Sequence, residues 1–203
     1  MSVITISRQF GAGGRSLGKL VAERLGYTYV DNEIIRIIAK KAKVSPHWVE
    51  SIEKEAGGRL SKFISSMVPK NLVARVLDDQ RGYIDEEIYV DLLRRIIIDI
   101  SKEGDAVIIG RGGQYILEGQ PDVYSILIIG DKEYRAKFVE KGSELTYKQA
   151  VQAVNMDDKR RMNLYRQFGR QDYDDPALYH MVLNMSKLGV KKASDLVCKL
   201  VAK

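Results

Sequence analysis

Short apolar runs alternate with longer stretches of helical periodicity along this chain. The runs at residues 3–7, 106–109 and 124–129 are rich in Val, Ile and Leu, as are buried strands, and a further short strand is predicted at 27–30. Between the first run and this short strand, Leu17, Leu20, Val21 and Leu25 recur at helical spacing until Gly26. A strand, a helix and a second strand in this order make a β-α-β unit with parallel strands. The pattern predicts an α/β fold whose parallel sheet is covered by helices on both faces.

Two longer segments interrupt this strand pattern. Residues 32–103 are helical in pattern throughout and predict a helical insertion, whose last helix covers 85–103. Thr146 and Gln149 form a capping box that opens a long charged helix, and a polar stretch follows it. We interpret residues 141–175 as a lid-like excursion, after which a last strand (179–185) and a last helix (190–202) complete a single domain, 1–203.

A glycine-rich loop follows the first strand. Gly11, Gly13 and Gly14 stand where the strand ends and a helix begins, so successive N–H groups can turn toward an anion there. The phosphate-loop pattern G-x-x-x-x-G-K-[ST], laid over Gly14-Arg15-Ser16, has Gln9 in place of its first glycine and Arg15 in place of its lysine. Ser16 keeps the hydroxyl that the pattern assigns to Mg²⁺.

Arginines recur near this predicted site. Phosphoryl transfer depends on cations that neutralise the moving phosphate, so arginines at the sheet edge or in the lid are the expected tools. Arg111 stands out because it lies between glycines directly after a buried strand, whereas any of the others could be a solvated surface charge. The candidates are Arg8, Arg15, Arg36, Arg111, Arg160, Arg161, Arg166 and Arg170.

The acidic candidates are open to two readings. Asp31 follows the second strand and could contact a substrate or support a metal, or it could cap the next helix. Asp157 and Asp158 could anchor lid arginines or pair with Arg161 on the helix surface.

Composition narrows the class of ligand. The net charge of +6 and the pI near 9.2 fit an anionic ligand. Basic residues are interleaved with acidic ones, which disfavours nucleic acid as a partner. Cys198 is the one cysteine, and no apolar run approaches the ~20 residues of a membrane span or forms the core of a signal peptide. We therefore expect a cytoplasmic protein without a membrane partner. The oligomeric state is left open.

Four segments resemble a known family. Residues 6–15 (ISRQFGAGGR), 29–31 (YVD), 108–113 (IIGRGG) and 182–184 (VLN) are similar, in family order, to the cytidylate kinase-like P-loop proteins. The resemblance spans nearly the whole chain. It implies a nucleoside monophosphate kinase fold with a five-stranded parallel sheet, a helical nucleotide-binding insertion at 32–103 and a lid. It also implies ATP and Mg²⁺ as cofactors and phosphoryl transfer to a small acceptor, foremost a nucleoside monophosphate.

The resemblance also implies roles for individual residues. Arg15 would take the lysine's place and Ser16 would face Mg²⁺. Arg36 and Arg111 would hold the acceptor phosphate, with Asp31 nearby, while Arg161 and Arg166 would serve as lid arginines. Gly112 stands where true cytidylate kinases have an aspartate, so the acceptor's identity stays open. The residues that would wrap the ATP phosphates are Gly11, Ala12, Gly13, Gly14, Arg15 and Ser16.

Two other readings compete with the kinase. Gly11-x-Gly13 after a strand, with Asp31 twenty positions beyond Gly11, imitates a Rossmann dinucleotide fingerprint. The residues Arg8, Gln9 and Phe10 oppose this reading because they separate the first glycine from the strand end. Alternatively, the altered loop could belong to a nucleotide-binding or regulatory protein that retains the kinase fold with little catalysis.

Overall fold

The fold is built on one parallel sheet. A computed structural model describes residues 1–31, 86–167 and 174–202. In this part of the chain, five parallel strands pair in the order β2-β3-β1-β4-β5, which confirms the predicted sheet. The strands are β1 (Val3–Arg8), β2 (Thr28–Val30), β3 (Ala106–Ile109), β4 (Val123–Ile129) and β5 (Met181–Asn184).

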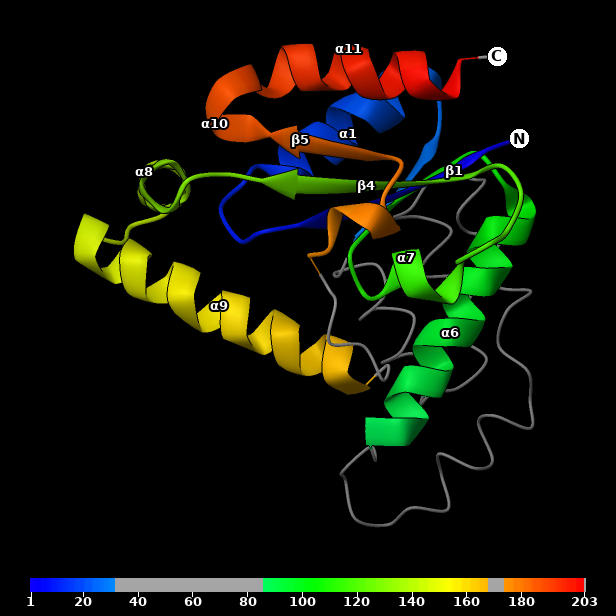
Figure 1. Cartoon of the computed structure of the whole chain (residues 1–203), viewed down its shortest axis with the longest axis horizontal. Helices are drawn as coiled ribbons and strands as arrows, with labels where there is room; N and C mark the ends of the chain where they lie inside the picture. The colour runs from blue at the N-terminus through cyan, green and yellow to red at the C-terminus, as the bar shows by residue number, and fades with distance from the viewer. Residues whose placement is uncertain (32–85, 168–173, 203) are drawn as a thin grey trace, which may run out of the picture.

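Helices cover both faces of the sheet. Helices α1, α10 and α11 lie on one face, whereas α6, α7 and α9 lie on the other, and α8 stands beyond the carboxyl end of β4 (Figure 1). Their bounds are α1 (Gly14–Leu25), α6 (Glu86–Glu103), α7 (Gly113–Ile116), α8 (Lys132–Lys141), α9 (Tyr147–Gln167), α10 (Met185–Leu188) and α11 (Val190–Val201).

The core lies between the sheet and the helix pair α1 and α11. Apolar side chains of β1, β3 and β4 are fully buried there, as expected for strands covered on both faces. Helix α1 approaches the sheet closely at Gly18, where a Cβ atom would lie 3.1 Å from Cε2 of Tyr29. The main contributors are Ile4, Ile6, Leu17, Val21, Val107, Ile109, Ile126, Ile128, Val197 and Val201.

The strand order brings three loops together at the carboxyl edge. Because β3 lies between β1 and β2, the chain leaving β3 runs beside the chain leaving β1. The N–H of Gly110 donates to the carbonyl of Ile6 at 3.0 Å, and the N–H of Gln9 donates to the carbonyl of Ile128 at 2.9 Å. Ligands of open α/β sheets bind at this edge.

Most of the predicted elements are observed within a few residues. The capping box is confirmed, because Thr146 N donates to Oε1 of Gln149 at 2.9 Å and Gln149 N to Oγ1 of Thr146 at 3.4 Å. The last strand is shorter than predicted. The 3₁₀ turn Pro176–Leu178 ends just before the expected start, the strand begins only at Met181, and Asn184 ends it by accepting a hydrogen bond from Ser186 N to cap α10. Cys198 is partly buried against the core.

Several predictions fall outside the described residues. These are Arg36, Arg170, most of the helical insertion (32–85) and residues 168–173 of the lid-like segment. Of the insertion and the lid, the described portions are α6, α9 and the short stretches beside them, so their roles stay predictions. In the parts of the chain that the structure describes, no helix is long and apolar enough to cross a membrane.

Candidate functional site

The glycine loop between β1 and α1 has two glycines in the left-handed conformation and leads directly into a helix. Gly11 and Gly13 have φ angles of +79° and +84°, and helix α1 begins at Gly14, directly after Gly13. A Cβ atom on Gly11 would lie 2.6 Å from the carbonyl oxygen of Arg135, so the loop passes close to α8. No side chain caps the first turn of α1. Its N–H groups are therefore left for an anion at the positive end of the helix dipole.

The loop after β3 is unusual in its backbone. Gly110, Arg111 and Gly112 have consecutive φ angles of +69°, +58° and +73°. A left-handed conformation costs a residue with a Cβ roughly 1–2 kcal/mol, so Arg111 is held there by its surroundings. Its side chain is partly buried. Strain of this kind concentrates at binding and catalytic sites.

Arg8 links the two loops. Its stem passes over Gly14, where a Cβ atom would lie 2.9 Å from Cγ of Arg8, and its guanidinium lies against Gly110. Burial lowers the pKa of Arg8. Tyr165 opposes that shift, while the positive charges of Arg161, Arg111 and Arg15 add to it. Three of the four arginines predicted to be catalytic thus act on the guanidinium of Arg8 and share its neighbourhood.

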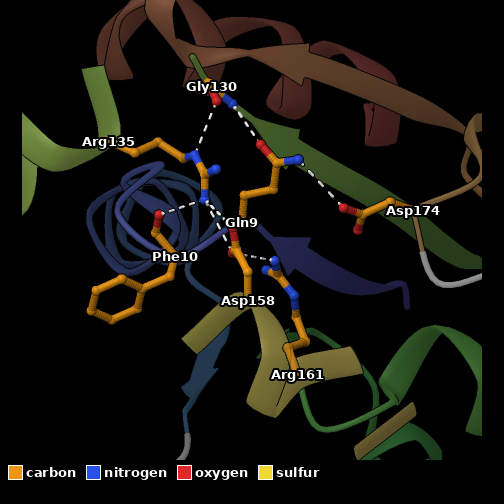
Figure 2. Close-up of polar contacts among 7 residues, drawn as sticks. All are labelled: Gln9, Phe10, Gly130, Arg135, Asp158, Arg161 and Asp174. Atoms are coloured by element: carbon orange, nitrogen blue, oxygen red, sulfur yellow. Dashed lines mark hydrogen bonds and ion pairs between the residues drawn. The ribbon is translucent and has the colours of Figure 1, made fainter. Parts of the chain in front are cut away.

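A polar network ties the glycine loop to helices α8 and α9 (Figure 2). Arg135, at 3% exposure, donates to the carbonyls of Gly130 (3.0 Å) and Phe10 (3.2 Å) and to both oxygens of Asp158 (2.8 and 3.1 Å). Asp158 also accepts from Nη2 of Arg161 at 2.9 Å. Asp158 thus pairs with Arg161 within α9, as in the second of the two readings that the sequence left open, and its contact with Arg135 ties that pair to α8.

Gln9 completes this network. Its Oε1 accepts from the N–H of Gly130 at 3.1 Å, and its Nε2 donates to Oδ2 of Asp174 at 3.4 Å (Figure 2). The residue that stands in place of the first glycine of the phosphate-loop pattern is thus used to fasten the loop to the end of β4.

The remaining predicted residues are more dispersed. Asp31 is buried at the end of β2, beside Tyr29; burial raises the pKa of Tyr29 to about 12, and the charge of Asp31 adds to the rise. Ser16 is exposed in the first turn of α1. Arg166 is exposed near the end of α9, where Nη2 lies 3.9 Å from Sδ of Met162, and it is not among the charges that shift Arg8. Arg36 and the side chain of Arg160 lie outside what the structure describes.

The residues around the glycine loop fit a Mg²⁺ ion that binds together with the phosphates of a nucleotide. Mg²⁺ keeps several waters and takes one or two protein oxygens together with phosphate oxygens. The described residues hold no cluster of three or more His, Cys, Asp or Glu that would form a separate metal site. Ser16, exposed in the first turn of α1, carries the hydroxyl that could face such an ion.

Sequence reasoning missed Arg135 and assigned no separate role to Arg8. Arg135 lies in a helix of low amphipathic regularity, after the fourth strand, in a segment for which the periodicity predicted no element. The available clue was its position one turn after Gly130-Asp131, at the carboxyl end of a central strand.

The structure matches those of P-loop kinases. It aligns with a crystal structure of an uncharacterized protein from Eubacterium ventriosum at TM-score 0.64 and 22% identity, over 99% of this chain and 98% of that one. It aligns with shikimate kinase from Bacteroides thetaiotaomicron at TM-score 0.52 and 11% identity, over 98% of each chain. A gluconokinase from Sinorhizobium meliloti aligns at TM-score 0.50 and 14% identity, over 98% of this chain and 93% of that one.

The sheet order, the glycine loop at its edge and these likenesses define a P-loop kinase fold. The amino-acid sequence assigns the chain to a narrower class, a single family. Residues 3–187 match the cytidylate kinase-like family, and the chain belongs to that family. A search of curated proteins finds no match. Family membership supports phosphoryl transfer and nucleotide binding in general, and it makes the Rossmann reading of the glycine loop wrong.

Proposed function

We propose that this protein transfers the γ-phosphoryl group of ATP, with Mg²⁺, to a small acceptor, foremost a nucleoside monophosphate. The observation that carries the proposal is the clustering of Arg15, Arg111 and Arg161 around Arg8 beside the N-terminus of α1. A cluster of arginine side chains at one helix N-terminus fits an anion of several charges, such as the phosphates of two nucleotides.

Each part of the site has a role in this proposal. The loop N–H groups and Arg15 hold the ATP phosphates, while Arg111, with Asp31 nearby, orients the acceptor. An acceptor oxygen attacks the γ-phosphorus in line as the bond to the β–γ bridging oxygen breaks, so that ADP leaves with that electron pair. Arg161 reaches the site from α9, where it neutralises charge on the moving group. Arg166 and Arg36 are proposed to join it from the lid and the insertion. Bound Mg²⁺ would neutralise charge on the phosphate oxygens.

Helix α9 would close over the reacting phosphates as a lid. Water is the competing acceptor, so closure limits ATP hydrolysis. Asp158 fixes Arg161 while it is itself held by the buried Arg135, so the lid arginine is placed before substrate arrives.

A coupled assay of ADP release tests the proposal. ATP and Mg²⁺ would be combined with nucleoside monophosphates of each base, and with hydroxyl acceptors such as shikimate and gluconate, which the names of the structural neighbours suggest. We expect turnover with at least one nucleoside monophosphate. Arg111→Ala should lower it by roughly 100-fold, whereas Arg95→Ala, at an exposed position on α6, should not.

The altered loop favours one alternative, a regulatory protein that binds nucleotide without catalysis. Arg15 in place of lysine is not a neutral change at a phosphate, because a planar guanidinium and a compact ammonium contact oxygens differently. ATP binding without turnover on any acceptor in the panel would contradict the kinase and support this alternative.

A further inference from the structure

We propose that Arg8 is the inner phosphate-binding cation of this site and that it occupies the space which a side chain on the first residue of α1 would otherwise fill. The proposal deepens the proposed function, on which it rests for the identity of the anion. The phosphate-loop pattern places its cation at Arg15, so this assignment adds a second residue from the strand side of the loop.

The first line of evidence is the fit between Arg8 and Gly14. Gly14 begins α1 and is not among the residues with positive φ, so its backbone does not require glycine. The contact with Arg8 does require glycine, because a Cβ atom on Gly14 would lie 2.9, 3.1 and 3.3 Å from Cγ, Cβ and Cδ of Arg8. The crowded atoms are near the base of the side chain, which cannot move aside without moving the whole arginine.

The second line of evidence is at the other end of the side chain. The guanidinium of Arg8 lies against Gly110, where a Cβ atom would overlap Nη1. Gly110 is itself fixed by the hydrogen bond from its N–H to Ile6. Glycines from two separate loops thus make a channel for one arginine, and a surface arginine would need no such channel.

The third line of evidence is the charge around Arg8. Other arginines at this edge have carboxylate partners, since Asp158 pairs with both Arg135 and Arg161. Across the described residues, no ion pair or hydrogen bond joins Arg8 to a carboxylate, and the charged side chains acting on it include three more arginines. A partly buried guanidinium surrounded by like charges is costly unless an anion joins it. Phosphate groups at the N-terminus of α1 are the anion that fits.

Binding measurements on a set of variants test this assignment. The probes are MgATP and inorganic tripolyphosphate, measured by calorimetry. Arg8→Ala should weaken both by roughly 10- to 100-fold, the loss of a charge-assisted contact. Arg95→Ala is the matched control and should leave both unchanged. Arg8→Met keeps the stem without the charge and replaces Arg8→Ala should that variant unfold.

The unliganded stability of these variants separates binding from a structural role. Removing an unpaired charge should leave the melting temperature of Arg8→Met at or above that of the wild type, whereas removing a structural arginine would lower it. A clear loss of stability with unchanged tripolyphosphate affinity would overturn the proposal.

Gly14 provides a second, independent test. Gly14→Ala should weaken tripolyphosphate binding because it displaces Arg8, although alanine favours the helix. In an Arg8→Gly background the same change should have an effect below about twofold, because no side chain is left to displace. The double variant Arg8→Gly/Gly14→Lys moves the cation to the first residue of α1. It should recover most of the lost affinity for tripolyphosphate. Additive losses, or no recovery, would contradict the assignment.

These outcomes are distinct from failure of the proposed function. A wild-type protein that binds tripolyphosphate but transfers phosphate to no acceptor overturns the kinase, while the Arg8 series still decides the role of Arg8. Normal turnover by the Arg8→Ala variant overturns the role of Arg8 alone.

Discussion

Arg111 combines two properties that act in opposite directions. Its charge contributes to the arginine cluster, whereas its left-handed backbone, with φ +58°, disfavours any side chain at this position. Glycine on either side leaves Arg111 as the strained residue of the three. A residue kept in such a conformation is better explained by binding than by folding.

Substitutions of Arg111 should therefore separate activity from stability. Arg111→Ala and Arg111→Gly both remove the side chain and should both lower kcat/KM by roughly 100-fold, as does the loss of one preorganised donor in other enzymes. The glycine variant should nevertheless be more stable than the alanine variant by about 1 kcal/mol, because glycine accepts positive φ. Urea unfolding of the pair measures this difference. Equal stabilities would mean that the backbone there is not strained.

The raised pKa of Tyr29 predicts how the stability of the fold changes at alkaline pH. Burial raises the pKa of Tyr29 to about 12, the charge of Asp31 adds to the rise, and Arg15 and Arg8 oppose it. The folded pKa lies above the unfolded value, so the unfolded chain releases this proton first. The stabilisation is complete below pH ~10 and is lost as the pH rises toward ~12. Tyr29→Phe should lose stability less steeply over that range in urea unfolding, and identical slopes would refute the assignment.

At the scale of elements, α8 and α9 hold the glycine loop from outside the sheet. Arg135 of α8 contacts the loop at Phe10 and the end of β4 at Gly130, and it joins α9 through Asp158 (Figure 2). One side chain therefore joins the glycine loop, far away in sequence, to the end of β4 and to α9. Placement of the loop depends on this contact as well as on the sheet.

Replacing Arg135 by methionine should destabilise the fold far more than the same change at an exposed pair. Arg135→Met leaves the carbonyls of Phe10 and Gly130 without their donor and one side of Asp158 unpaired, at a cost of about 3 kcal/mol. Arg24→Met is the control, because Arg24 also pairs with an aspartate, Asp195, at the shorter distance of 2.6 Å but in an exposed position. Its cost should stay below about 1 kcal/mol.

Urea unfolding of both variants checks this contrast. Similar losses would mean that burial does not set the strength of these ion pairs.

Elements with a strong local pattern could be predicted from the sequence, and contacts between them could not. Continuous apolar runs identified the strands, and the capping box located the start of α9. Helix α8 has little amphipathic regularity, since it lies at the end of the sheet and buries chiefly Arg135 and Ala136. Likewise, no sequence pattern indicates that Arg8 needs Gly14 and Gly110, because β3 must first be placed beside β1.

At the scale of the whole molecule, the arginine cluster draws on segments far apart in the chain. Arg8 ends β1, Arg111 follows β3, and Arg161 lies in α9, so the site exists only when the sheet and α9 are assembled. The like charges repel one another in the unliganded protein. A polyanion that binds here should therefore stabilise the entire fold, because the unfolded chain cannot reproduce the cluster.

Inorganic tripolyphosphate should accordingly raise the melting temperature. At about 100 times its Kd, a ligand specific for the folded state adds about 2.7 kcal/mol, which for a chain of this size corresponds to roughly 5–10 °C. Differential scanning fluorimetry with and without tripolyphosphate measures the shift, and Arg8→Met should reduce it. Potassium chloride at equal ionic strength is the control, because it screens the net charge of +6 without occupying the loop. If the salt reproduces the shift, the stabilisation comes from general screening and the cluster does not form a polyanion site.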